Sequence, residues 1–195
     1  MQGIHPLNLD VVPPARVARW RPLANWVLVA PASLWLAVLT VGAEVVAVCG
    51  WFAIVLTGRL PDSWGDYLVG VLRYQWRVAA FLYGWTERRP GFAVPAGHVD
   101  PGDHPAILYS ARPLRRSRPG ALARLLLAAP HLAALVALGL AEAAVLTAAW
   151  VAVVALGRWP EPMRRFAVGA MRWQARVTAY VWLVVDVYPP FAFEA

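Results

Sequence analysis

The sequence predicts an all-α integral membrane protein made of two tandem parallel repeats, each with a short strand, a transmembrane helical hairpin and an interfacial amphipathic helix. Three observations support this class. The chain has 195 residues, of which 60% are hydrophobic and 15% are charged, whereas soluble domains contain roughly 45–50% and 25%. Two long windows are almost free of ionisable side chains. The first half of the chain also matches the second half in one register.

A tandem duplication sets the domain organisation. Residues 1–96 and 100–195 align without a gap and are identical at about one position in three, which indicates an internal repeat. The identical positions include residue types that chance rarely aligns: Trp51 and Trp150, Gly58-Arg59 and Gly157-Arg158, Pro61 and Pro160, Gln75 and Gln174. We therefore expect repeat 1 at 1–96, a linker at 97–99 and repeat 2 at 100–195.

Each repeat opens with a segment of alternating apolar residues. Leu7, Leu9 and Val11 alternate in the first copy, and Ala106 and Leu108 do so in the second. Alternation with a period of two residues predicts a short strand. Arginines follow in both copies, so each strand is expected to lead into a basic stretch beside the membrane.

The two apolar windows predict membrane segments. One helix over the whole first window would reach about 55 Å, against a hydrocarbon core of about 30 Å. A hairpin resolves this mismatch, so we expect transmembrane hairpins at about 23–58 and about 122–157. The turns are expected near Gly42 and Gly139, because glycine eases a reversal of the chain.

Charge distribution favours the same hairpins. Each window holds one acidic residue, Glu44 or Glu142, which a hairpin brings to the headgroups and a single helix leaves near the bilayer midplane, at a cost of several kcal/mol. With hairpins, all eighteen arginines also fall on one side, as the positive-inside rule prefers. We therefore expect a multi-pass protein of the cell (inner) membrane, with four membrane segments, cytoplasmic termini and repeats related by an axis along the membrane normal.

An arginine-bearing amphipathic helix follows each window, at about 64–86 and about 163–185. Arg73 and Arg77 lie four residues apart, as do Arg172 and Arg176, so each pair occupies one helix face. Such a helix is expected to lie in the interface and to contact anionic headgroups or a partner. The same role is expected of two further arginines that follow the hairpins, Arg59 and Arg158. A dedicated site for an anionic lipid or a phosphate-bearing substrate is the alternative.

The last segment of each repeat is marked by proline and predicted to be extended. In the second copy Phe191 and Phe193 alternate after Pro189-Pro190, which is the period of a strand. This segment is expected to pair with the first strand of the repeat.

The chain shows no pattern typical of a catalytic centre, a cofactor or a metal site. Its single cysteine, Cys49, excludes a cysteine-ligated zinc or iron–sulfur site within one chain. His131 is the only histidine in an apolar window, and a bis-histidine haem would need a second one. We therefore read His131 as a polar helix contact. The net charge of +7, in so apolar a chain, favours a membrane surface over nucleic acid as the partner.

Several runs resemble one known family. They are Trp51 to Pro61 (WFAIVLTGRLP), Val69 to Ala80 (VGVLRYQWRVAA), Gly157 to Pro160 (GRWP), Val168 to Tyr180 (VGAMRWQARVTAY) and Tyr188 to Phe191 (YPPF). They are similar to a bacterial membrane family, common in actinobacteria, that is catalogued as a domain of unknown function numbered four-three-eight-nine. The resemblance covers nearly the whole chain, once in each repeat. It implies the membrane fold and brings no activity, substrate or catalytic residue.

Two functions of different classes follow from these observations. The first is a non-catalytic accessory or scaffolding subunit of a larger membrane complex, with anionic lipids and other membrane protein subunits as partners. The second is a small pseudo-symmetric carrier or channel for an ion or lipid. Its ion or proton path would be lined by Glu44, Glu142, Gln75 and Gln174, where the two glutamines are candidate partners of each other.

Overall fold

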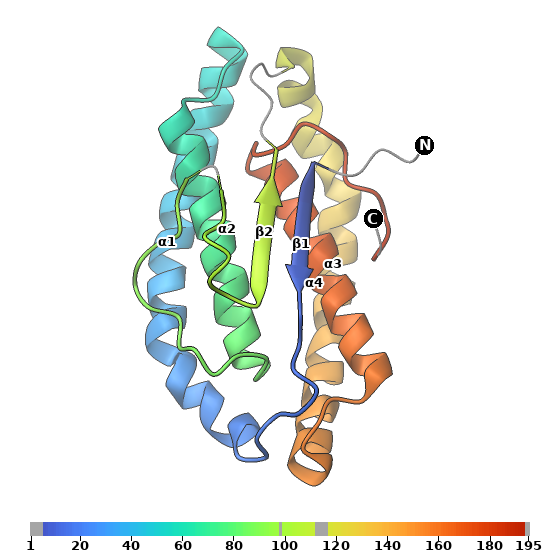
Figure 1. Ribbon diagram of the computed structural model, residues 1–195. Coiled ribbons are helices and arrows are strands. Elements are labelled where there is room, and N and C mark those ends of the chain that lie inside the picture. The colour runs from blue at the N-terminus through green and yellow to red at the C-terminus, as the bar shows by residue number, and fades with distance from the viewer. Residues whose placement is uncertain (1–5, 98, 112–116, 194–195) are drawn as a thin grey trace.

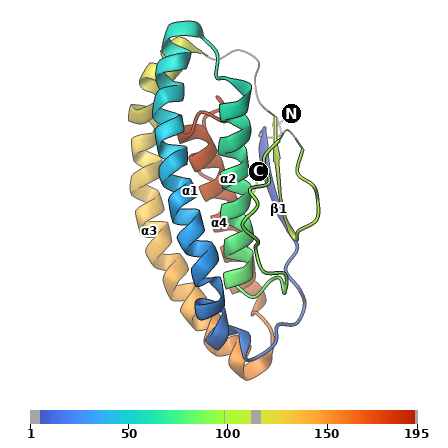
Figure 2. The ribbon, with the colours of Figure 1, turned by 90° about the vertical axis from the view of Figure 1, so that its left-hand side faces the viewer.

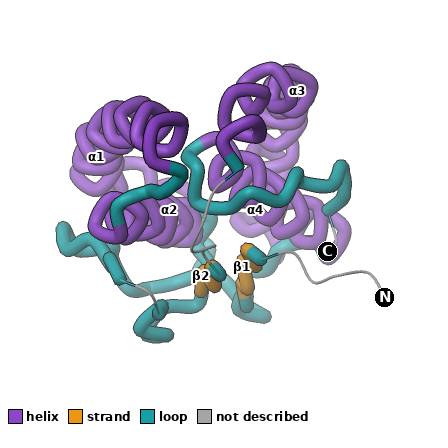
Figure 3. The backbone as a smooth tube through the Cα atoms, turned by 90° about the horizontal axis from the view of Figure 1, so that it is seen from above, coloured by secondary structure: helices purple, strands orange, loops and turns teal. Residues whose placement is uncertain are grey.

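The computed structural model describes residues 6–97, 99–111 and 117–193. Its elements follow the chain as strand β1 (Leu7–Val11), helices α1 (Arg21–Thr57) and α2 (Asp62–Leu82), strand β2 (Ala106–Ser110), and helices α3 (Arg118–Leu156) and α4 (Glu161–Val181). They form three layers (Figures 1 and 3). Helices α1 and α3 make one outer layer, α2 and α4 lie in the middle, and the two strands cover the other side.

The repeated Gly-Arg-x-Pro sequence ends the long helices and starts the next ones. Gly58 and Gly157 adopt φ values of 74° and 68°, in the left-handed region that glycine enters without steric cost. Their N–H groups close the helices by donating to the carbonyls of Ile54 and Val153. Pro61 then stands in extended conformation before α2, as its equivalent does before α4.

The predicted hairpins are wrong, because each apolar window forms one continuous helix. Helix α1 has 37 residues and α3 has 39, and both are long and apolar enough to cross a membrane by length and composition. Gly42 lies inside α1, where a Cβ atom would come within 2.5 Å of the Tyr67 hydroxyl oxygen. This glycine therefore makes room for a tyrosine of α2 and does not reverse the chain. Four membrane segments are accordingly not supported.

Equivalent helices run in opposite directions, so the predicted parallel arrangement of the repeats is also corrected. Trp26, near the start of α1, contacts Trp150, near the end of α3, with ring centroids 4.4 Å apart. At the other end, Trp51 Nε1 donates to the carbonyl of Ala121 at 2.8 Å. The cause is topological. Each repeat crosses the molecule three times, with a strand, a long helix and a returning helix, so repeat 2 starts at the end of the molecule opposite to where repeat 1 starts and is inverted (Figure 1).

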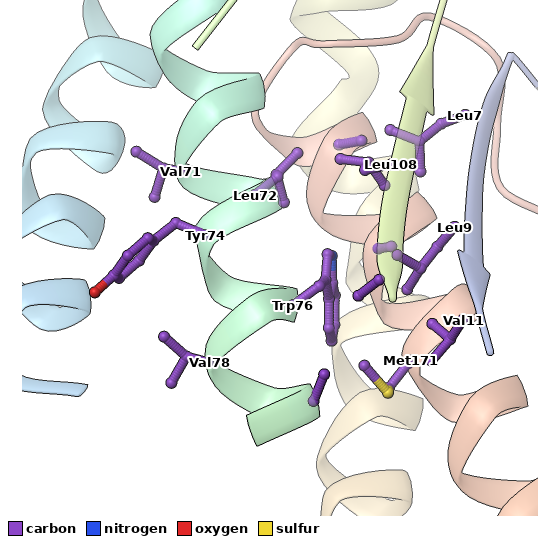
Figure 4. Close-up of a cluster of buried hydrophobic side chains, with 14 of the residues drawn as sticks. Leu7, Leu9, Val11, Val71, Leu72, Tyr74, Trp76, Val78, Leu108 and Met171 are labelled. Atoms are coloured by element: carbon purple, nitrogen blue, oxygen red, sulfur yellow. The ribbon is translucent and has the colours of Figure 1, made fainter. Parts of the chain in front are cut away.

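A pseudo-twofold axis passes through the centre of the sheet. Strands β1 and β2 pair antiparallel, with Leu9 opposite Leu108, and these two leucines are equivalent positions of the repeats. The strands are exchanged between repeats, because β1 packs on α4 and β2 packs on α2. Figure 4 shows Leu9, Leu108, Trp76 and Met171 among the buried side chains beneath the strands. Burial of this shared core gives each repeat part of its hydrophobic stabilisation from the other.

The expected strand at the end of repeat 2 does not form in the described part of the chain. The residues after α4 instead cover α3 and α4. Phe191 stacks on His131, with ring centroids 3.8 Å apart, and Phe193 packs edge-on against Phe166. Aromatic packing on α3 and α4 thus replaces strand pairing for this segment.

Candidate functional site

The first candidate for a functional surface is an apolar face formed by α1 and α3. It lies on the side turned away from α2, α4 and the sheet (Figures 2 and 3). We define the apolar face by the large hydrophobic residues of these helices that are 41–79% exposed: Leu23, Trp26, Val27, Leu34, Val38, Val41, Val45, Val48, Phe52 and Leu56 of α1, and Leu122, Leu126, Leu127, Leu132, Val136, Leu140, Val151, Val154 and Leu156 of α3. Soluble monomers rarely expose so large a contiguous apolar surface.

The two acidic residues of the apolar windows lie between the repeats, where they accept hydrogen bonds. Glu142 of α3 accepts from the Tyr83 hydroxyl at 2.5 Å and from Gln174 Nε2 at 2.6 Å. Glu44 of α1 accepts from Trp182 Nε1 at 3.0 Å. Tyr83 and Trp182 are equivalent positions. Each therefore reaches across the pseudo-twofold axis to the carboxylate of the other repeat, and Gln174 contacts Glu142 where the sequence suggested Gln75.

A pocket of about 240 Å³ adjoins Glu44. Its wall includes Trp51 and Phe52 of α1, Arg124 of α3 and Leu183 after α4. Leu183 is the only described non-glycine residue with positive φ, at 62°, a conformation that is strained for a bulky side chain. The equivalent residue of repeat 1 is Gly84, with φ 76°, so the turn is conserved between repeats although the residue is not.

Sequence analysis missed Arg124, which is buried and joins α3 to the end of α4. Its guanidinium donates to the carbonyls of Tyr180 and Val185 at 2.6 and 2.8 Å and to Asp186 Oδ1 at 2.5 Å. The equivalent Asn25 donates to the carbonyl of Phe81, which is the position equivalent to Tyr180. Comparison of the two repeats reveals this shared role, because both side chains satisfy the same helix-end carbonyl.

Four of the predicted headgroup-binding arginines lie on the sheet side and bond within the protein. Arg73 is 1% exposed and Arg176 is 3% exposed, so neither fits a contact with headgroups. Arg73 Nε donates to the carbonyl of Leu108, and the equivalent Arg172 Nε donates to that of Leu9. Each thus binds the central residue of the strand from the other repeat. Arg77 is only 13% exposed and pairs with acidic residues of the connection before β2.

Asp100 organises that connection. One of its carboxylate oxygens lies 3.3 Å from Arg73 Nε and the other 3.2 Å from Arg77 Nη2. The same carboxylate accepts from the N–H groups of Gly102 and Leu108 at 3.0 and 3.1 Å. Asp100 is 7% exposed, and a buried carboxylate is stable when charges and N–H donors surround it in this way.

His104 lies beside this cluster and stays neutral. Its Nδ1 accepts from the Ala106 N–H at 3.1 Å, and the residue is 6% exposed. Burial, followed by the positive charge of Arg77, lowers the pKa of His104 from 6.5 to about 4 against the opposing charge of Asp103. The site therefore holds a histidine that resists protonation.

Arg59 and Arg158 lie exposed at opposite ends of the long helices. Near Arg158, a pocket of about 690 Å³ is lined by Arg16, Arg19 and Leu156. At the opposite end Gly58 faces Arg118, the equivalent of Arg19. Hairpins would have brought all eighteen arginines to one side of the membrane segments, whereas the inverted repeat of continuous helices places a basic cluster at each end.

His131 is enclosed by aromatic rings. It is 0% exposed and contacts Trp173, Tyr188 and Phe191, with ring centroids 5.9, 4.9 and 3.8 Å away. Among the described residues, no group of three or more His, Cys, Asp or Glu side chains is placed to hold a metal ion. The aromatic contacts fit a packing role for this histidine.

Comparison with known proteins supports the duplication. A family model described as a domain of unknown function, DUF4389, matches residues 21–93 and again residues 118–192. Each match covers one long helix, the returning helix and the segment that follows it. The predicted family and its two tandem copies are thus confirmed, whereas the bacterial origin and the boundaries at 97–99 stay predictions. No curated protein and no solved structure gives a significant match.

Proposed function

The chain belongs to the DUF4389 family through both of its halves, and we propose that it is a non-catalytic membrane protein that acts as an accessory or scaffolding subunit. In this proposal the apolar face contacts lipid, arginines at its ends bind anionic headgroups, and the sheet side is available to other membrane protein subunits. The order of the layers separates these two contact surfaces.

The exposure of the two apolar helices supports this proposal. In the most apolar 18-residue stretches of α1 and α3, only 28% and 11% of the residues are buried, whereas a core helix of a soluble protein would be mostly buried. Water contact over such a surface is unfavourable by about 25 cal/mol for each Å². Lipid removes this cost without any change in the fold.

The charges around the apolar face support anionic lipid. The chain has a net charge of +7, and exposed arginines flank the face at both ends, Arg59 and Arg118 at one and Arg19 and Arg158 at the other. Each basic residue near an anionic membrane contributes about 1 kcal/mol of attraction. Arginine also binds phosphate oxygens in a bidentate manner.

Flotation of the full chain with lipid vesicles tests this proposal. Protein diluted from detergent should float with vesicles of phosphatidylcholine and phosphatidylglycerol in equal parts, and less completely with phosphatidylcholine alone. High salt should reduce the difference between the two vesicles, because it screens exposed charges. A chain that stays dispersed and monomeric in the absence of both detergent and vesicles would contradict a membrane role.

The carrier is the second candidate, favoured by the exchanged hydrogen bonds of Glu44 and Glu142. Two carboxylates between inverted repeats resemble the midplane sites of transporters with internal symmetry. If they bind an ion or proton, Glu44→Gln and Glu142→Gln should abolish the uptake of that ion or proton into proteoliposomes, while the protein still binds vesicles. If the protein is a scaffold, both variants should float with vesicles as the unchanged chain does, and no ion flux should separate them.

A further inference from the structure

We propose that the apolar face lies flat on one leaflet of an anionic bilayer, so that α1 and α3 run parallel to the membrane plane and do not cross it. This inference rests on the proposed membrane role and adds its geometry. It makes the protein a monotopic one, with the sheet in water above the membrane.

The sheet lies halfway along the long helices, and its position is fixed by contacts. The Tyr67 hydroxyl donates to the carbonyl of Leu39, and Asn25 donates to that of Phe81, so α2 runs back along α1. The Trp26–Trp150 and Trp51–Ala121 contacts set the centre of the α1–α3 pair close to Val38. The pseudo-twofold axis joins this centre to the Leu9–Leu108 pair in the middle of the sheet.

Charged side chains are exposed at that same level. The Asp10 side chain is 53% exposed and lies next to Leu9, and the side chain of Arg172, which binds the Leu9 carbonyl, is 33% exposed. The two side chains form an ion pair, with Arg172 Nη2 3.9 Å from Asp10 Oδ1. If α1 and α3 crossed the bilayer, this pair would lie close to its midplane, where charged side chains are costly even when they are paired. In the flat orientation they stay in water.

The exposed side of the sheet leads to the same conclusion. In the described chain the sheet has two strands, and each pairs only with the other. Side chains bond the outer edges at their centre, where Arg73 and Arg172 donate to the carbonyls of Leu108 and Leu9. The polar side chain of Asn8 is exposed on β1. Polar side chains are favoured in water and costly in hydrocarbon, so the sheet side suits the flat orientation.

The basic ends of the long helices complement one anionic surface. Gly58 with Arg118 marks one end and Gly157 with Arg19 marks the other, about 55 Å away along the helices. A spanning orientation would place these arginines on opposite sides of the membrane. Lying flat, both ends reach the headgroups of one leaflet, and the pseudo-twofold axis stands along the membrane normal.

Depth measurements at three positions of one helix stripe test the orientation. Cys49 is the only cysteine of the chain and is exposed on α1, so it takes a nitroxide label without substitution. Val38→Cys and Val27→Cys, each in a Cys49→Ser chain, extend the stripe to side chains that are 56% and 75% exposed. Successive labels are about 16 Å apart along the helix. Tyr109→Cys in the same Cys49→Ser chain, on the sheet side and 54% exposed, is the matched control.

The depth of each label is measured in vesicles of phosphatidylcholine and phosphatidylglycerol in equal parts. The measurement compares how often the nitroxide collides with oxygen, which concentrates among acyl chains, and with a nickel chelate, which stays in water. The flat orientation predicts the same shallow depth at positions 27, 38 and 49, and free access of the chelate to position 109. A depth maximum at Val38→Cys, with lipid contact at Tyr109→Cys, would overturn the flat orientation and leave the membrane role intact.

Two further outcomes would also overturn the inference. Spin–spin broadening between copies, together with loss of oxygen collisions at all three α1 positions, would mean that a second copy covers the apolar face. Failure of all labelled chains to float with the vesicles would remove the membrane role itself. The flotation step therefore separates failure of the proposed function from failure of the orientation.

Discussion

The Tyr83 hydroxyl donates a hydrogen bond to the Glu142 carboxylate across the boundary between the repeats, at 2.5 Å. The equivalent residue of repeat 2, Trp182, donates to Glu44 of repeat 1 at 3.0 Å. Both donors stand directly after a middle-layer helix, at the point where its last carbonyls need partners. The duplication thus produces a reciprocal link, in which the acid of each long helix is held by the other half of the chain.

The first prediction concerns this link. Tyr83→Phe should lower the free energy of unfolding by about 1–3 kcal/mol, because a hydrogen bond to a carboxylate is lost. Denaturant unfolding in mild detergent, followed by tryptophan fluorescence, measures the change. Tyr109→Phe removes an exposed hydroxyl and should leave stability unchanged. In a Glu142→Ala chain, Tyr83→Phe should have almost no further effect on the free energy of unfolding. The same decrease in that chain as in the unchanged one would contradict the link.

The second prediction concerns Gly42. Gly42→Ala should destabilise the fold by about 1–2 kcal/mol, since its Cβ would lie 2.5 Å from the Tyr67 hydroxyl oxygen and displace the hydrogen bond to Leu39. Gly139→Ala is the matched control, because nothing lies within 4 Å of its Cβ position, and it should be neutral or stabilising. Adding Tyr67→Phe should recover most of the loss. Equal effects of both alanines would contradict the packing role of Gly42 against Tyr67.

The third prediction concerns pH. The folded state lowers the pKa of His104 to about 4 from 6.5, so the unfolded chain binds the proton more readily between these values. Stability should therefore be complete above pH 6.5 and fall by about 1–3 kcal/mol as the pH drops toward 4. His104→Asn keeps an acceptor for the Ala106 N–H and cannot titrate. The difference in unfolding free energy between the two chains should change across this window, and a constant difference would contradict the assignment.

The fourth prediction concerns the ends of the apolar face. Arg59→Gln and Arg158→Gln should each weaken binding to phosphatidylglycerol vesicles about fivefold, because each removes about 1 kcal/mol of attraction. Partition coefficients at low ionic strength measure the effect, and high salt should erase it. Arg88→Gln removes the same charge from a side chain that is 63% exposed and paired with Asp103. It should bind normally, and equal losses in all three variants would argue for a general charge effect.

Local residue patterns were sufficient for several elements. The strands at Leu7–Val11 and Ala106–Ser110 follow from apolar alternation, and the arginine-bearing helices at 62–82 and 161–181 lie within a few residues of the predicted ranges. The family and its two copies also follow from short runs of sequence. These features depend on neighbours in the chain, which a single sequence displays.

Whether the arginines contact headgroups or bond within the protein depended on contacts that the sequence does not display. Arg73 and Arg77 share one face as predicted, yet that face meets Asp100, more than twenty residues later in the chain. A helix in the interface and a helix between two layers have the same spacing of charges. Burial decides between them, and burial depends on which elements pack above.

By itself, the sequence determined the duplication, the apolar character of the two long helices and the family. Only the tertiary structure decided that Gly42 packs against Tyr67, that the repeats are inverted and that their strands are exchanged. The physical reason is that each repeat crosses the molecule three times and cannot cover its own core. The surfaces that cover it lie about a hundred residues away in the chain, and local periodicity does not predict contacts at that separation.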